Sequence, residues 1–489
     1  MLKRIGEEIK PQFSEVKIKN SIYPKPFDIG LEFNAPVHGT WNIVHIGFMM
    51  PEAHQVYVCA DNCMRGVVMT AAEMNELDRF HSVTLFEKDL LNGSLENETI
   101  EGVSDVINKL DERPKIIELF TVCLHHFLGC DLDYVYATLE KRFPDIIFVR
   151  CFMDPILQRT SYTPEQKLRK AMLEFIKPLD VKKNIYLLGS DVKIRDCYIF
   201  DIASKYGYSV KQIHDMKTFD EYMEIGDGAL YIANYPTGLY GVSELANRLN
   251  RPFLYLPYET TEEKINEDII LLDYVLSEIN ENIDHGCKID ISIVDKNNEL
   301  VDDNVSINKE VLLDEYNVDI VDYIDKSDLI TDDIVKLEDK IAEVKSIISD
   351  TEISVDYTAH PRPLGVARFL LDNGFNVKDV YLDAISPEEE ENYYYLKEQY
   401  GELMLKATIH PEGRVIERDN RRVLAIGQKA AWFNNTTHFV NVIEGDGCIG
   451  YKGLMNLLDM MVEALGEEKD LDDIVPRKAV GLCSNCGIL

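Results

Sequence analysis

Long apolar stretches and positive charge are scarce in this sequence. No run of about 18 apolar residues occurs, so we expect no membrane-spanning helix. The first residues, MLKRIGEEIKPQ, lack the apolar core of a secretory signal, and we therefore predict a cytoplasmic protein. Only 51 Lys and Arg stand against 86 Asp and Glu, which gives a formal net charge of −35. Because such a surface repels phosphate groups, we expect no nucleic acid partner.

Motifs of several common enzyme classes are also missing. No GxxxxGK[ST] sequence occurs, so the chain has no phosphate-binding loop of its own for nucleotide hydrolysis. The zinc-binding motif HExxH is absent as well. The acidity leaves two interpretations open. It could form a surface that docks on a basic patch of a protein partner, or it could simply keep the protein in solution.

Strand-like and helical patterns alternate along most of the chain. Apolar runs such as HQVYVCA, KIIELFTVC and NIYLLGS read as buried strands, and each precedes a loop and a helical pattern. Strands that alternate with helices of about 10–15 residues are typical of parallel, doubly wound sheets. We therefore predict an α/β protein with three Rossmann-like doubly wound parallel-sheet domains and a helical acidic insertion.

Domain boundaries are expected where this pattern or the composition changes. The first unit covers 1–180, the second 181–260 and the third 351–466. Between them, 261–350 is rich in Asp, Glu, Asn and Ile and has helical periodicity, so we predict an acidic insertion that is helical and partly irregular. It would form a solvated face or a partner surface. The last segment, 467–489, is a tail that ends in a CxxC pair.

Cysteines carry most of the functional information. Two groups follow strand-like runs of the first unit, in YVCADNCMRG and ELFTVCLHHFLGCDLD. Strand-end loops of one α/β domain can converge, and thiolates that converge there would hold an iron–sulfur cluster. The predicted cofactor and metal ligands are Cys59, Cys63, Cys123 and Cys130. His125 and His126 beside them could tune such a cluster through outer contacts, or could simply flank it.

The remaining cysteines have plainer interpretations. Cys151, Cys197 and Cys287 lie in or beside apolar stretches, where a free cysteine packs as a small hydrophobe. The cysteines of the two loops could also be buried structural thiols, and that alternative stays open. Cys483 and Cys486 form the terminal CxxC, which could bind a metal, act as a dithiol or belong to a flexible tail.

Polar residues at the ends of strands in the second and third units are candidates for a substrate cavity. Ligands of open parallel sheets bind outside the carboxyl ends of the strands. Asn234, His360, Arg362 and His438 stand at or near such ends. A surface or capping role is the alternative for each of them.

The cysteine loops resemble those of component 1 of the nitrogenase superfamily. PVHGTWNIV, around His38, is similar to the glycine motif that opens the family's cluster domain. YVCADNCMRG has Cys63 at the position of a family cysteine, and TVCLHHFLGCD has Cys123 at the position of a cluster ligand. The resemblance extends over roughly 30–290 and 350–465.

Departures from the family pattern bear first on the cluster. The family's first cluster cysteine aligns with His38 in this chain, and Cys59 or Cys130 could compensate. The resemblance therefore implies a [4Fe–4S] cluster rather than the larger eight-iron cluster of nitrogenase.

Other departures bear on the substrate. The cysteine that anchors the family's iron–molybdenum cofactor aligns near Asn234, and the anchoring histidine aligns near Val440, two residues from His438. With both of these ligands replaced, the resemblance implies a substrate other than dinitrogen.

Relatives that lack this cofactor include tetrapyrrole reductases and scaffolds for cofactor assembly. The resemblance therefore implies a nitrogenase-like iron–sulfur oxidoreductase component that reduces a substrate the sequence does not identify. Its electrons would come from an ATP-dependent iron–sulfur reductase, which would carry the phosphate-binding loop this chain lacks. The chain would work as a homodimer, or as a heterodimer or α2β2 tetramer with a related subunit, with the cluster near the subunit interface.

Two alternatives stay open. One is a non-catalytic metal-cluster scaffold or maturation protein, and the other is an acidic subunit whose cysteines are structural. An enclosed cavity with convergent polar groups would favour catalysis, whereas an open and exchangeable metal site would favour the scaffold.

Overall fold

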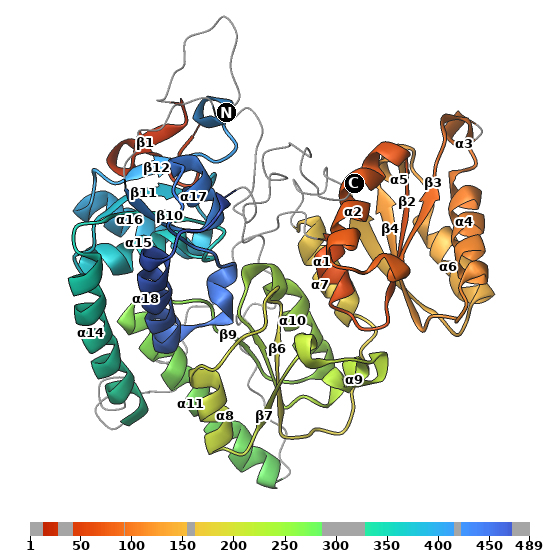
Figure 1. Ribbon diagram of the computed structural model, residues 1–489. Coiled ribbons are helices and arrows are strands. Elements are labelled where there is room, and N and C mark those ends of the chain that lie inside the picture. The colour runs from red at the N-terminus through yellow and green to blue at the C-terminus, as the bar shows by residue number, and fades with distance from the viewer. Residues whose placement is uncertain are drawn as a thin grey trace, which may run out of the picture.

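The computed structural model contains three β-sheets, each with helices packed against it (Figure 1). This arrangement confirms the α/β class and the three parallel-sheet units, while the boundaries drawn from composition stay predictions. The structure describes residues 13–27, 43–91, 93–153, 162–285, 328–414 and 422–471. Outside these ranges lie His38, Cys287, Cys483 and Cys486.

The first sheet has the strand order β3-β2-β4-β5, with all neighbours parallel. Its strands are β2 (His54–Cys59), β3 (Phe80–Thr84), β4 (Ile116–Val122) and β5 (Ile147–Met153). Its helices are α1 (Ile43–Phe48), α2 (Asp61–Glu73), α3 (Glu87–Leu91), α4 (Leu95–Lys109), α5 (Cys123–Phe127), α6 (Leu132–Arg142) and α7 (Pro164–Leu173). Along β2, Val56 and Val58 join one core while Tyr57 and Cys59 join another. Because strand side chains alternate, this apolar run needs cover on both faces of the sheet.

The second sheet has the order β7-β6-β8-β9 and is also fully parallel. Its strands are β6 (Asn184–Leu188), β7 (Ser209–Gln212), β8 (Leu230–Ala233) and β9 (Phe253–Tyr255), and its helices are α8 (Tyr198–Lys205), α9 (Phe219–Met223) and α10 (Pro236–Leu249). Helix α10 begins at Pro236 within the segment YPTG, since proline suits the first helical position. Helix α10 packs on α7, and one apolar core joins the first two sheets.

The third sheet has six strands in the order β1-β12-β11-β10-β13-β14. The strands are β1 (Glu15–Lys17), β10 (Glu352–Asp356), β11 (Val377–Tyr381), β12 (Met404–Lys406), β13 (Val423–Ile426) and β14 (Phe439–Val440). The helices are α15 (Pro363–Asp372), α16 (Glu390–Gln399), α17 (Gln428–Asn434) and α18 (Gly450–Gly466). Only β1 is antiparallel, and it pairs with β12 at one edge. A strand from the start of the chain thus completes the last sheet.

Helices α11 (Glu262–His285) and α14 (Asp328–Ile348) occupy the described parts of the acidic segment. Both confirm the predicted helical periodicity. Ile265, Ile269, Leu272 and Leu276 of α11 recur at three or four residues and are buried in the core that joins the second and third sheets. Helix α14 packs on α18 (Figure 1). These helices therefore belong to the main packing of the molecule. None of the described helices is long and apolar enough to cross a bilayer.

Candidate functional site

The two cysteine loops lie at the same edge of the first sheet. Strands β2 and β4 are parallel neighbours, with Tyr57 opposite Phe120, so their carboxyl ends are adjacent. Cys59 is the last residue of β2 and Cys63 lies in the first turn of α2. Cys123 is the first residue of α5, directly after β4. The fold thus brings together the strand ends that carry the predicted ligands.

The four thiols differ in their surroundings. Cys59 is fully buried, and burial together with the nearby Cys63 raises the pKa of its thiol to about 12. Burial and the negative charge of Glu96 raise the pKa of Cys130 to about 12. Cys63 is exposed and Cys123 is partly exposed. Cys130 is partly exposed as well. Cys63 is therefore the most accessible donor, whereas Cys59 and Cys130 must each lose a tightly held proton before binding a metal.

No group of three or more His, Cys, Asp or Glu side chains converges closely enough to hold a metal ion within the described part of the chain. Thiols are the ligand type that iron–sulfur clusters require, and these lie at an accessible edge of the sheet. The number of converging donors in a single described chain is smaller than a cluster needs. The residues present thus fit part of a ligand set.

His125 fixes the turn that carries Cys123. The backbone N–H of Val122 donates to its Nδ1 at 3.2 Å, and its Nε2 lies 3.3 Å from the Thr99 hydroxyl. Burial lowers the pKa of His125 to about 4, so the ring is neutral near neutral pH. Both ring nitrogens are engaged in the protein, which makes His125 a positioning residue. His126 is exposed.

Large apolar side chains are exposed in the segments that follow β3 and β4. Phe86 follows β3, Leu91 ends α3, and Phe127 and Leu128 close the turn after Cys123. Their exposed fractions are 53%, 86%, 67% and 53%. Contiguous exposed apolar side chains are typical of protein interaction sites, and Phe127 and Leu128 are consecutive in one turn.

A second candidate site is a cavity between the second and third sheets. Its volume is about 20 Å³, room for a water-sized molecule. Tyr258 and Glu259 reach it from beyond β9, His360 from beyond β10, and Cys448 from the loop before α18. Leu454, Leu457 and Met460 of α18 form an apolar wall. The cavity therefore lies where strand ends of two parallel sheets meet, as the ligand sites of such sheets do.

The hydrogen bonds of His360 determine what it presents to this cavity. The backbone N–H of Arg362 donates to its Nδ1 at 3.1 Å. Burial and the positive charge of Arg362 lower the pKa of His360 to about 3, so the ring is neutral. A neutral imidazole that accepts at Nδ1 carries its proton on Nε2. His360 is therefore a hydrogen-bond donor at Nε2 rather than a ready metal ligand.

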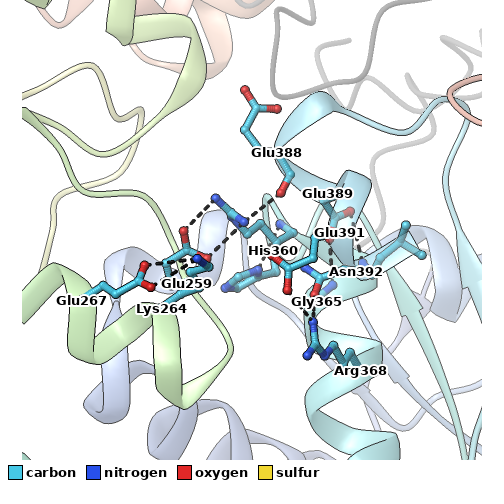
Figure 2. A network of polar contacts seen from close by, with 12 residues as sticks. Glu259, Lys264, Glu267, His360, Gly365, Arg368, Glu388, Glu389, Glu391 and Asn392 are labelled. Carbon is cyan, nitrogen blue, oxygen red and sulfur yellow. Dashed lines mark hydrogen bonds and ion pairs between the residues drawn. The ribbon is translucent and has the colours of Figure 1, made fainter. Parts of the chain in front are cut away.

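A polar network that includes Glu259, Glu388 and Glu389 joins the second and third units (Figure 2). Arg362 belongs to this network. Its guanidinium lies 3.1 Å from the Glu259 carboxylate and donates to the Glu388 carbonyl at 2.9 Å. Nearby, the Glu389 carboxylate accepts the backbone N–H groups of Leu364 and Gly365 at the start of α15, at 3.2 and 2.7 Å. Arg362 thus ties the cavity wall together and is not among the residues that line the cavity.

The two other predicted cavity residues lie elsewhere. Asn234 is buried at the end of β8, where its amide donates to the Leu256 carbonyl at 2.8 Å. His438 precedes β14, and its Nδ1 lies 3.1 Å from the Ala464 carbonyl of α18. Val440 is buried within β14. Of the four candidates, His360 is the one that lines the cavity.

Tyr258 and Cys448 are among the cavity residues that sequence reasoning missed. Tyr258 is only 1% exposed, and its hydroxyl forms no hydrogen bond of normal geometry with the described residues. Cys448, which no motif singled out, accepts a hydrogen bond from the Asn456 amide at 3.4 Å, and burial raises the pKa of its thiol. The only available signal was the glycine-rich stretch from Gly445 to Gly450, which follows a strand-like run.

A wider, open groove of about 480 Å³ lies between the first and second units. Phe48 and Met49 line one side, and Ile213, His214 and Met216 line the other. The groove contains none of the predicted site residues. Its volume suits a larger ligand than the enclosed cavity does.

Comparisons with known proteins agree with this architecture. No protein-family model matches the chain, and no curated protein matches it in sequence. A solved structure described as nitrogenase Cp1 at pH 6.5 superimposes with a TM-score of 0.57 at 11% identity, over 93% of this chain and 96% of that one. Nitrogenase Cp1 at pH 5 gives 0.53 at 12% identity, over 92% and 93%. The chain therefore has the nitrogenase component 1 fold, as the resemblance of its cysteine loops implied.

Proposed function

We propose that this chain is a nitrogenase-like iron–sulfur oxidoreductase component. It receives electrons from an ATP-dependent iron–sulfur reductase and delivers them to a small substrate other than dinitrogen. The observation that carries the proposal is the location of Cys63 and Cys123, which follow adjacent parallel strands at one sheet edge. The shared fold supports it over nearly the whole chain.

The cluster, when bound, supplies the electron-transfer chemistry. Cys63 and Cys123 would hold it, and Cys59 and Cys130 are the further thiols of the same loops. Because one described chain offers too few convergent donors, we propose that a second copy or a related subunit completes the ligand set. Exposed Phe127 and Leu128 beside the turn support a protein partner at this edge.

Iron and acid-labile sulfide content, with an electron paramagnetic resonance spectrum, tests this proposal on anaerobically purified protein. We expect about four irons per chain or per dimer. Cys63→Ala and Cys123→Ala should each lose the iron, while Cys151→Ala, which alters a buried thiol of the same sheet, should keep it. Reconstituted wild type without iron would overturn the electron-transfer role.

A scaffold or maturation protein is the second candidate, and the exposure of Cys63 favours it because exchangeable clusters need an accessible site. The two functions differ in how firmly the iron is held. A scaffold should release its cluster to a chelator or an acceptor protein within minutes. An electron-transfer component should retain its cluster and should bleach when mixed with a reduced iron–sulfur reductase and ATP.

A further inference from the structure

Hydrogen bonds hold one wall of the open groove between the first and second units in place. Arg79 donates to the carbonyls of Met50 and Ala53 at 3.2 and 3.0 Å, and to that of Phe48 at 3.3 Å. Its guanidinium also covers the Phe48 ring, 4.9 Å from the ring centroid. These contacts fix the segment between α1 and β2, which forms this wall. The wall is therefore preformed, as the walls of ligand sites usually are.

The opposite wall is held against this segment by direct contacts between the two units. The carboxylate of Glu52 accepts the backbone N–H of Phe219, the first residue of α9, at 2.9 Å. Beside it, Lys115 of the first unit pairs with Asp220 of the second at 2.9 Å. The two walls thus keep a defined separation, and the groove is a built feature of the fold.

Two methionines, one from each unit, present apolar surface to the groove. Met49 and Met216 line it, and each is only partly buried against the core that joins the two units. Phe48, Pro51 and Ile213 complete the apolar lining. Thioether side chains adapt their shape and make favourable contacts with aromatic rings. At about 480 Å³, the groove is in the size range of small-molecule sites, so a flat aromatic molecule suits the space between the methionines.

Most of the polar groups that line the groove are already engaged. Glu52 and Arg79 make the contacts described above, and Arg79 also pairs with Glu76 at 2.9 Å. His214 donates from Nε2 to the Asp191 carbonyl at 3.1 Å, and burial lowers its pKa, so its ring is neutral near neutral pH. Among the lining residues that the structure describes, this leaves a single charged side chain, which is a cation.

That cation is Lys217, which lies just before α9. It is exposed, and its ammonium group forms no hydrogen bond or ion pair with the described residues. Its charge acts on Glu221, whose carboxylate already accepts the backbone N–H groups of Lys217 and Thr218. A cation left without an ion pair beside an apolar wall is distinctive in a chain with 86 acidic and 51 basic residues. A carboxylate can bind it without breaking another ion pair.

We propose that this groove binds a planar aromatic carboxylate of two or more fused rings, with its rings between Met49 and Met216 and its carboxylate on Lys217. The site goes beyond the proposed electron-transfer function, because none of the predicted cluster or cavity residues lines it. Since the ligand contacts both units, its binding also stabilises their packing.

Calorimetric titration of the full chain with 2-naphthoate tests this site, and we expect one molecule bound per chain. In Lys217→Met, the affinity for 2-naphthoate should fall roughly fivefold, while the affinity for uncharged 2-naphthamide should stay the same. Met216→Gln should weaken the binding of both compounds roughly tenfold, because it replaces apolar surface with an amide. Thermal unfolding of each variant without ligand checks that it is folded.

Lys211→Met is the matched control. Lys211 lies in β7, pairs with Glu224 at 3.1 Å and does not line the groove, so this variant should bind both compounds as wild type does. Absence of saturable 2-naphthoate binding, or equal affinity in wild type and Met216→Gln, would overturn the site. Equal losses in Lys217→Met and Lys211→Met would overturn the role of Lys217. Iron content is measured separately, so failure of the electron-transfer proposal would be recognised independently.

Discussion

The cysteine edge of the first sheet and the cavity between the second and third sheets have the same kind of location in the fold, but the first is exposed and the second is buried. Both lie at carboxyl ends of parallel strands. At the cysteine edge, soft thiols and large apolar side chains face outward, as Cys63 and Phe127 show. At the cavity, Tyr258 and Leu454 are buried among protein groups. A strand end left uncovered can meet a protein partner, whereas one covered by another unit is closed to a partner and can enclose only a small molecule.

The largest difference in stability is expected between two variants in which alanine replaces a glycine with positive φ. Gly189, at the end of β6, has a φ of +92°, and a Cβ there would lie 2.7 Å from the Gly238 Cα. Gly129, in the cysteine loop, has a φ of +63° and no described atom within 4 Å of such a Cβ. Gly189→Ala should lower the free energy of unfolding by more than about 3 kcal/mol, and Gly129→Ala by about 1 kcal/mol. Urea denaturation measures both, and equal losses would show that the two strand ends are packed alike.

Loss of Arg362 should weaken the contact between the second and third units. Its ion pair with Glu259 is about nine-tenths buried on both sides, so Arg362→Ala leaves a buried carboxylate without its main partner. We expect a loss of about 3 kcal/mol in the free energy of unfolding, with iron content unchanged. Arg113→Ala, which breaks an exposed pair with Asp145, is the control and should cost about 0.5 kcal/mol. Thermal and urea unfolding of both variants measure these losses, and equal losses would contradict a special role of the buried pair.

A smaller effect is expected at the turn behind Cys123. His125→Ala removes the acceptor of the Val122 N–H and the neighbour of Thr99, which should cost about 2 kcal/mol and reduce iron retention after reconstitution. His126→Ala alters an exposed ring of the same turn and should change neither quantity. If both variants keep full iron, the turn does not depend on His125 for its geometry.

The smallest effect concerns the pH dependence of the first unit. The pKa of Glu118 is raised from 4.5 to about 8, so the folded state favours the protonated acid. Its contribution to stability is complete at acid pH and is lost as the pH rises through about 8. Glu118→Gln should therefore gain about 1 kcal/mol relative to wild type in alkaline solution and little in acid. Urea midpoints measured across this pH range test the sign, and a gain at acid pH would contradict it.

Element types followed from the sequence more reliably than element limits. The runs HQVYVCA, KIIELFTVC and NIYLLGS contain β2, β4 and β6, because apolar runs flanked by turns report burial directly. The short strands β1 and β12 were missed, since three-residue strands have too little periodicity to recognise. The acidic segment was expected to form a solvated face or a partner surface. The apolar residues of α11 are instead buried in the core, because burial follows the apolar stripe of a helix and not the overall composition of the segment.

The sequence by itself determined the alternation of strands and helices, the thiols at two strand ends and the resemblance to nitrogenase component 1. These features are local, so neighbouring residues suffice to specify them. Only the tertiary structure decided that Glu444 meets Ser190 across 254 positions of chain and that Tyr258 and Cys448 share a cavity with His360. Burial, protonation and contact at such a junction depend on how separate units pack, and no periodicity along the chain encodes that.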